Sequence, residues 1–244
     1  MNMAEAYSYT EEQIDLSLQK RIDQRVEEIL QYVYPADKIL ELGCGKGLLA
    51  ARLNQKVHAE IHGIDISSSG VLLAKKLGIK AIKADLNRTL PYKNNTFDVI
   101  FSDQLLEHIY DTDNLINEMY RILKPGGVAV TITPNLSFWL NRILFLFGFY
   151  PIFLEVSNKT KTYGTLFLKH VIKEFQSVGH IHVFNKASLT DIFRSNGFKI
   201  IDIKGLPLSW KMMQPLQLFY DLIDSACSRF PSIARDLVIV VKKP

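Results

Sequence analysis

Residues 38–54, KILELGCGKGLLAARLN, decide the fold of this chain. The apolar run at 38–42 predicts a buried strand, and the apolar residues from Leu48 onward predict a helix that follows almost at once. Three glycines lie between these two elements, where they let the backbone approach a ligand closely. The first N–H groups of a helix also attract anionic groups. A strand, a glycine loop and a helix in this order therefore predict a binding site for a nucleotide-like ligand.

The rest of the chain alternates between short apolar runs and stretches with helical spacing. Runs that are apolar on both faces and bounded by Gly, Asp or Pro are typical of strands in a parallel sheet. We expect such strands at 61–65, 80–85, 97–102, 128–133, 198–203 and 237–241, and helices at 48–54, 68–77, 115–123 and 186–195. This order predicts a doubly wound, Rossmann-like α/β fold with helices on both faces of the sheet.

The glycine spacing distinguishes between two kinds of cofactor. A nicotinamide dinucleotide site has the pattern G-x-G-x-x-G, in which the third glycine lets the helix pack against the strand. Counted from Gly43, the sixth position here is Leu48, and the third glycine comes one place early, at Gly47. An acidic residue, Glu41, also precedes the first glycine by two places. The loop therefore disfavours a nicotinamide-dependent oxidoreductase, which stays open as an alternative.

The pattern acidic-x-G-x-G-x-G resembles the cofactor loop of class I S-adenosylmethionine-dependent methyltransferases. Further landmarks follow in that family's order at predicted strands and their ends, namely Asp65, Asp85, FDVIFS at 97–102 and LKPGG at 123–127. Each landmark alone could be a helix cap or an ordinary turn, but this many in order are hard to produce by chance. The resemblance covers 38–135 and implies a seven-stranded sheet, mostly parallel with an antiparallel last strand. It also implies S-adenosylmethionine as cofactor and S-adenosylhomocysteine as its product.

The resemblance implies a set of cofactor-binding residues. The set is Glu41, Gly43, Cys44, Gly45, Gly47, Asp65, Ile66, Asp85, Leu86, Ser102, Asp103 and Gln104. Its three glycines shape the loop, and its first aspartate, Asp65, accepts hydrogen bonds from the ribose hydroxyls. Asp85 contacts the adenine amino group, and the last three residues lie beside the methyl group.

Three further segments narrow the class of methyl acceptor. LLEHI at 105–109 and TPN at 133–135 look like the branch of the family that methylates small molecules, including quinone precursors, and residues 182–198 resemble that branch as well. We therefore predict methyl transfer to an oxygen, nitrogen or carbon atom of a small, fairly apolar acceptor. A methyltransferase-like binding module without turnover stays open as a further alternative.

A general base is needed only if the accepting atom carries a proton at the working pH. The candidates are His108, which follows the fourth predicted strand, and His180 and His182, which precede the last predicted helix. If residues 180–182 are extended, side chains two residues apart point the same way, so both imidazoles would lie on one face. The alternative for each histidine is a hydrogen bond to the backbone. The spacing offers no carboxylates arranged with the histidines for metal binding, so we expect no metal.

The composition is that of an ordinary globular protein, with 48% hydrophobic and 22% charged residues. A net charge of +4 is spread along 244 residues and forms no basic run. Residues 102–105, SDQL, also lack the motif used to methylate exocyclic amines of bases, so both features argue against a nucleic-acid substrate. Cys44 and Cys227 have no partners at metal-ligand spacing, and we expect reduced thiols in a cytoplasmic protein.

We expect one methyltransferase domain over residues 1–244, with local insertions. Its parts are an N-terminal helical cap (1–36), a cofactor-binding core (37–135), an aromatic-rich insertion (136–180) and C-terminal strands (181–244) with a second insertion (206–231).

The aromatic-rich insertion has seven aromatic residues between Phe138 and Phe153. One interpretation is a lid over an apolar acceptor. Such a lid could also contact a lipid-like substrate or a membrane surface. Others are a pair of core helices and a contact between two copies of the chain in a homodimer. The N-terminal helix could close the other side of the pocket, with Tyr7 and Tyr9 facing the cofactor.

Overall fold

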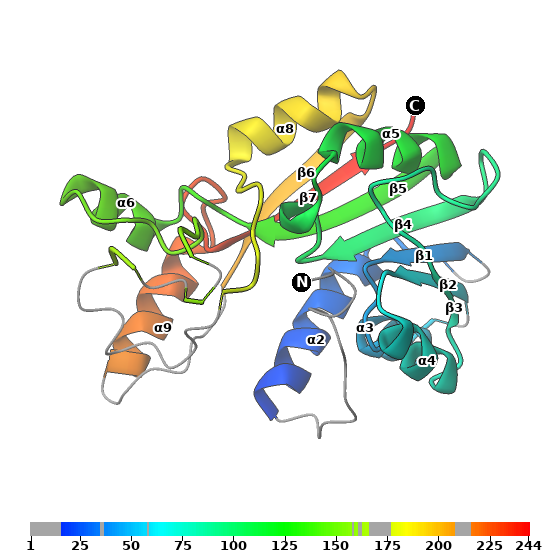
Figure 1. The fold of residues 1–244 in the computed structure, drawn as a ribbon, viewed down its shortest axis with the longest axis horizontal. Helices are drawn as coiled ribbons and strands as arrows, with labels where there is room; N and C mark the ends of the chain where they lie inside the picture. Colours follow the sequence, from blue (N-terminus) through cyan, green and yellow to red (C-terminus); the bar gives the residue numbers. More distant parts are fainter. Residues whose placement is uncertain are drawn as a thin grey trace.

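A computed structural model describes residues 16–34, 37–57, 59–157, 159–160, 163–165, 177–207 and 216–244, so Tyr7 and Tyr9 lie outside the described residues. A seven-stranded sheet forms the centre, with strand order β3-β2-β1-β4-β5-β7-β6 (Figure 1). The strands are β1 (Lys38–Leu42), β2 (Glu60–Asp65), β3 (Lys80–Lys83), β4 (Phe97–Asp103), β5 (Leu123–Pro134), β6 (Lys199–Leu206) and β7 (Asp236–Lys242). Only β7 runs antiparallel to its neighbours, β5 and β6, which confirms the predicted sheet.

Helices cover both faces of this sheet, as predicted (Figure 1). They are α2 (Leu16–Leu30), α3 (Leu48–Asn54), α4 (Ser68–Lys76), α5 (Thr112–Ile122), α6 (Trp139–Leu146), α8 (Lys186–Ser195), α9 (Leu216–Cys227) and the short 3₁₀ helix η1 (Leu106–His108). Apolar residues of α2, α3 and α4, such as Val26 and Leu53, pack on one face of the sheet. Those of α5 and α8, such as Met119 and Phe193, pack on the other face. The burial of these two apolar layers is the main force that holds the helices on the sheet.

Several predicted boundaries differ from the structure, and two of the differences have a clear physical cause. The helix predicted at 115–123 begins at Thr112, because the side chain of Asp111 caps it by accepting a hydrogen bond from the N–H of Asn114 at 2.9 Å. The turn predicted at 123–127 is a bulge inside β5. Phe97 of β4 pairs with Leu123, and Val99 pairs with Val128, so the residues between Leu123 and Val128 leave the ladder.

The segments after β5 and β6 build a third apolar cluster beside the sheet. Phe138, Leu144, Ile152, Phe153 and Tyr220 form this cluster, which joins α6 to α9. Trp139 of α6 also donates a hydrogen bond from Nε1 to the Asp224 carboxylate of α9, at 3.0 Å. Within the described ranges, we find no helix that combines the length and the apolar character needed to cross a membrane.

Candidate active site

A cavity opens at the carboxyl edge of the parallel strands. Its lining is Gly43, Asp65, Ile66, Asp85, Leu86, Asn87, Gln104, Leu105, His108 and Ile109. These residues come from the ends of β1, β2, β3 and β4 or from the loops that follow them. Ligands of open α/β sheets bind at this edge, so the cavity lies where the sequence predicts the cofactor.

The glycine loop between β1 and α3 needs its glycines for both conformation and space. Gly43 and Gly47 have φ angles of +69° and +75°, which are strained for any residue with a side chain. A Cβ on Gly43 would lie 2.8 Å from Cδ1 of Leu105, and a Cβ on Gly47 would lie 2.8 Å from Cβ of Ala74 in α4. The loop can therefore pass close to neighbouring side chains and to a bound ligand only because these two positions carry no side chain.

Asp65, at the end of β2, binds the glycine loop and the start of α4 together. Its Oδ2 atom accepts a hydrogen bond from the N–H of Gly45 at 2.8 Å, and its Oδ1 atom accepts one from the N–H of Ser67 at 2.8 Å. The cap of α4 is Ser67 and not Asp65, since Oγ of Ser67 accepts a hydrogen bond from the N–H of Gly70 at 3.2 Å. Each carboxylate oxygen keeps a second lone pair, so Asp65 can also accept hydrogen bonds from two ribose hydroxyls.

Asp85 follows β3 and is held ionised. Partial burial would raise the pKa of Asp85, but hydrogen bonds from Asn87 and the nearby Arg88 outweigh this effect and lower it. The backbone N–H and the Nδ2 atom of Asn87 both donate to Oδ1 of Asp85, at 3.0 and 3.1 Å. An ionised carboxylate at this position can accept a hydrogen bond from an adenine amino group. Asn87 lines the same cavity and was missed in the sequence, although it lies two residues after Asp85.

Only one of the three residues predicted at the end of β4 lines the cavity. This residue is Gln104. Its backbone is in the left-handed region, at φ +51°, a conformation that costs a non-glycine residue about 1–3 kcal/mol. Ser102 instead donates from Oγ to Oγ1 of Thr131 at 3.1 Å, inside the sheet. Asp103 lies 3.3 Å from Arg25 of α2.

Half of the predicted cofactor residues line the cavity directly. These are Gly43, Asp65, Ile66, Asp85, Leu86 and Gln104, whereas Glu41, Cys44, Gly45, Gly47, Ser102 and Asp103 are outside its lining. Glu41 is buried, and burial raises the pKa of its carboxyl well above the usual value. A cofactor contact by any of the twelve residues stays a prediction.

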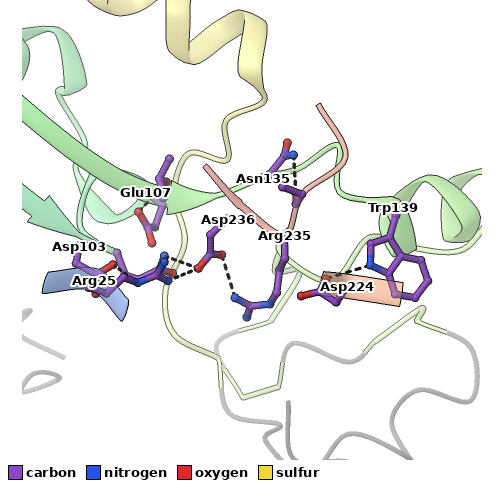
Figure 2. A network of polar contacts seen from close by, with 11 residues as sticks. Arg25, Asp103, Glu107, Asn135, Trp139, Asp224, Arg235 and Asp236 are labelled. Carbon is purple, nitrogen blue, oxygen red and sulfur yellow. Dashed lines mark hydrogen bonds and ion pairs between the residues drawn. The ribbon is translucent and has the colours of Figure 1, made fainter. Parts of the chain in front are cut away.

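A buried network of charges lies beside the end of β4 (Figure 2). Arg25 of α2, whose side chain is 1% exposed, donates from Nη2 to Oδ2 of Asp236 in β7, and its Nε lies 3.3 Å from Oδ1 of Asp103. Arg235 donates from Nη1 to the other oxygen of Asp236 at 2.9 Å. Burial raises the pKa of Asp103, and the charge of Arg25 only partly offsets this.

The sequence does contain a signal for the buried arginine. Arg25 follows Ile22 by three residues and precedes Ile29 by four, so it lies on the apolar stripe of α2 that faces the sheet. A charged residue in that register predicts a buried partner, but the pattern does not say which acid of the chain it meets.

The three candidate histidines all contact backbone carbonyl groups. His108 and His180 use Nδ1, with the carbonyl oxygens of Gly179 at 3.1 Å and Phe153 at 3.0 Å, and their ring centroids are 5.1 Å apart. His182 lies elsewhere, with Nε2 at 3.2 Å from the carbonyl oxygen of Tyr110. The chain bends at Ile181, so the extended geometry that would place His180 and His182 on one face is not formed. The structure thus brings His108 and His180 together, and only His108 lines the cavity.

Burial keeps both His108 and the neighbouring Glu107 uncharged near neutral pH. It lowers the pKa of His108 to about 4, helped by His180, and raises the pKa of Glu107 to about 8. A neutral His108 must donate from Nδ1 to bind the carbonyl oxygen of Gly179, so its proton is on Nδ1 and its lone pair is on Nε2. Thr133 donates from Oγ1 to the Glu107 carboxyl at 2.9 Å.

Glu107, His108 and His180 each place one nitrogen or oxygen atom within 4.8 Å of the others. Such a group could hold a metal ion, which sequence spacing did not indicate. The expectation that this chain uses no metal stays a prediction.

Comparison with known proteins places this site in a family. Residues 14–203 match the sequence profile of a family described as a methyltransferase domain. The chain belongs to this methyltransferase family. The resemblance to class I S-adenosylmethionine-dependent methyltransferases is thereby confirmed, and the chain is an enzyme of that class.

Relatives in this family differ in the atom that they methylate. The chain is 29% identical to a ubiquinone/menaquinone biosynthesis C-methyltransferase of Desulfotalea psychrophila over 71% of this chain and 70% of that protein. It is 33% identical to phosphoethanolamine N-methyltransferase 2 of Caenorhabditis elegans, over 40% of this chain and only 24% of that longer protein. A carbon acceptor and a nitrogen acceptor thus both occur among proteins similar to this chain.

Solved structures share the fold at low sequence identity. The [4+2]-cyclase SpnF superposes with a TM-score of 0.63 at 18% identity, covering 97% of this chain and 86% of that chain. A Haemonchus contortus phosphoethanolamine N-methyltransferase in complex with S-adenosyl-L-methionine gives a TM-score of 0.58 at 16% identity, over 91% of this chain and 52% of that one. A cyclase and a methyltransferase on one fold show that the fold alone does not determine the reaction.

Proposed function

We propose that this enzyme binds S-adenosylmethionine in the cavity at the carboxyl edge of the sheet. The proposal rests on one observation, the convergence of Gly43, Asp65, Asp85 and Gln104 from four parallel strands on one cavity. The shape and chemistry of the lining fit the cofactor. Gly43 leaves space that a Cβ would fill, Asp65 offers acceptors for ribose hydroxyls, and the ionised Asp85 offers one for the adenine amino group.

We further propose that the methyl group goes to an oxygen, nitrogen or carbon atom of a small, fairly apolar acceptor. When bound, the cofactor supplies a methyl group on a positively charged sulfur, and the protein supplies orientation and a dry pocket. Leu86, Leu105 and Ile109 provide the apolar part of the lining and exclude water. The family relatives methylate both carbon and nitrogen, so the accepting atom is left open in this proposal.

His108 is the residue of this cavity best placed to take a proton from an acceptor. It lines the cavity, its imidazole is neutral above about pH 4, and its lone pair is on Nε2. Its Nδ1 contact with Gly179 fixes the tautomer and the ring orientation. His180 supports this arrangement as a neighbour, while His182 points to a different carbonyl and has no part in the proposal.

Calorimetric titration with S-adenosylhomocysteine tests the cofactor site. We expect micromolar binding to the wild type, and at least a tenfold loss in Asp65→Ala because two ribose hydrogen bonds are removed together with the anchor of the glycine loop. Asp202→Ala, on the edge strand β6, is a matched control that should bind like the wild type.

The outcomes separate the alternatives. Binding of NADH without binding of S-adenosylhomocysteine would contradict the proposal and favour the oxidoreductase alternative. Binding without methyl transfer to any acceptor would favour a module without turnover. We also propose a cytoplasmic location, which the two free thiols, Cys44 and Cys227, support.

A further inference from the structure

Two helices beside the sheet expose apolar side chains at one end of the molecule. We call this surface the apolar end and define it by Ile143, Phe145 and Leu146 of α6, Phe147 directly after it, and Leu216, Leu218, Phe219 and Leu222 of α9. Leu146, Leu218 and Leu222 are exposed to 80%, 73% and 70%. Helices α6 and α9 lie on the same side of the molecule, away from α3 and α4 (Figure 1). Because α6 and α9 are joined by the third cluster, their exposed apolar side chains lie on neighbouring elements, and an exposed apolar patch is typical of a site of interaction.

Each of the two helices buries one polar side chain beside a residue of the third cluster and exposes several apolar side chains, unlike an ordinary surface helix. In α9, Asp224 is buried and accepts the hydrogen bond from Trp139. In α6, Asn141 is buried, where it donates to the carbonyl oxygen of Leu136 at 3.0 Å and accepts from the N–H of Ile152 at 2.8 Å. These two polar side chains are thus satisfied inside the protein, and the apolar side chains on the outside of the helices suit an apolar environment.

The charge around the apolar end is positive. On α6, on α9 and in the described segments next to them, every acidic side chain is buried or half-buried, namely Glu155, Asp221 and Asp224. Within the described part, Arg142 of α6, Lys159 and Arg229, which follows α9 by two residues, are exposed. Basic side chains beside exposed Leu and Phe are the combination that binds the surface of an anionic bilayer.

We propose that the apolar end docks on an anionic lipid bilayer, with α6 and α9 lying in the interface. Neither helix needs to cross the bilayer for this mode of binding, since apolar side chains enter only the headgroup and upper acyl region. A second copy of the chain fits this surface less well. Symmetric self-association would bring two copies of the exposed Arg142 and Arg229 together, whereas an anionic membrane complements these charges.

Vesicle co-sedimentation of the full chain tests this proposal. We expect binding to vesicles made of equal parts phosphatidylcholine and phosphatidylglycerol, much weaker binding to phosphatidylcholine alone, and loss of binding as salt is added. Leu146→Gln and Leu218→Gln should each weaken binding on the order of tenfold, because each removes one leucine from the interface. Leu72→Gln is the matched control, since Leu72 is a 59% exposed leucine on α4 at the other end of the molecule.

Three outcomes would overturn the proposal. The first is that the protein does not bind anionic vesicles, and the second is that it binds both kinds of vesicle equally. The third is that Leu72→Gln loses as much vesicle binding as Leu146→Gln and Leu218→Gln do. Sedimentation velocity without lipid tests whether a second copy of the chain binds the apolar end instead. If the protein does not bind vesicles but forms a dimer that Leu146→Gln and Leu218→Gln dissociate, the apolar end is a dimer interface. Retained binding of S-adenosylhomocysteine by each variant shows that it is folded.

Discussion

Adjacent residues at the cavity respond to the same burial in opposite directions. Burial disfavours the charged form of any group, so it raises the pKa of Glu107 to about 8 and lowers the pKa of His108 to about 4. Both side chains are therefore neutral near pH 7. The neutral imidazole fits the role proposed for His108 as a proton acceptor, and no local sequence pattern specifies either shift.

Glu107 should make the stability of the protein depend on pH. Its carboxyl has a pKa of about 8 when folded against an ordinary value of 4.5, so the folded state holds a proton that the unfolded chain releases. Stability is therefore full below about pH 4.5, falls as pH rises to about 8, and is constant above that, with a difference on the order of 4 kcal/mol.

Substitution of Glu107→Gln should remove this decline, because the amide is neutral at every pH and can still accept a hydrogen bond from Thr133. Urea unfolding at about pH 5 and about pH 9 measures the effect, and the wild type should lose more free energy of unfolding between the two than the variant. Equal losses in both proteins would show that Glu107 is ionised in the folded state.

At the scale of elements, the glycine loop fixes how α3 and α4 approach each other. Gly47 begins α3 with φ +75°, and a Cβ there would lie 2.8 Å from Cβ and 2.9 Å from Cα of Ala74. Gly78 follows α4 with a similar φ of +83°, but a Cβ there would have no atom within 4 Å. The two positions thus share backbone strain and differ only in contact.

We expect Gly78→Ala to cost about 1–2 kcal/mol from backbone strain alone, and Gly47→Ala to cost about 3 kcal/mol or more because two packed helices must also separate. The free energies of unfolding in urea measure both costs. Similar losses would mean that α4 moves away from α3 without penalty. Gly47→Ala should also weaken binding of S-adenosylhomocysteine, whereas Gly78→Ala should not.

Over the whole molecule, Arg25 connects the first described helix to the last strand. Its guanidinium reaches Asp236, which is 211 residues away in the chain, and the pair is fully buried (Figure 2). A contact between α2 and β7 across the end of β4 makes the N-terminal helix part of the same folding unit as the sheet. The expectation that the chain forms one domain stays a prediction, which this contact makes testable.

Arg25→Met should destabilise the protein by about 3–5 kcal/mol, because Asp103 would lose its ion pair and the buried Asp236 would keep only Arg235 as a cation. Asp103→Asn in the same chain should recover part of that loss, because it neutralises the carboxylate whose ion pair with Arg25 was removed. Thermal unfolding followed by circular dichroism measures both variants and should show one transition. A loss below about 1 kcal/mol, or separate melting of a helical part, would contradict the single-unit interpretation.

The alternation of strands and helices was determined by the sequence alone, because it depends on local periodicity. The strand at 38–42 and the helices at 48–54 and 186–195 have the predicted bounds. Residues next to strand ends, such as Asp65 and Asp85, could be placed at one edge of the sheet because parallel strands end together. The bulge at 124–127 could not be predicted, since it depends on the pairing of β5 with β4.

What the sequence determined by itself is the doubly wound sheet, the glycine loop and the membership of a methyltransferase family. Only the tertiary structure decided that Arg25 meets Asp236, that His180 lies beside His108 and not with His182, and that α6 and α9 expose their apolar faces together. The physical reason is range. Periodicity and glycine spacing are set by neighbours within a few residues, whereas ion pairing, burial-driven pKa shifts and surface patches depend on which distant segments the fold brings into contact.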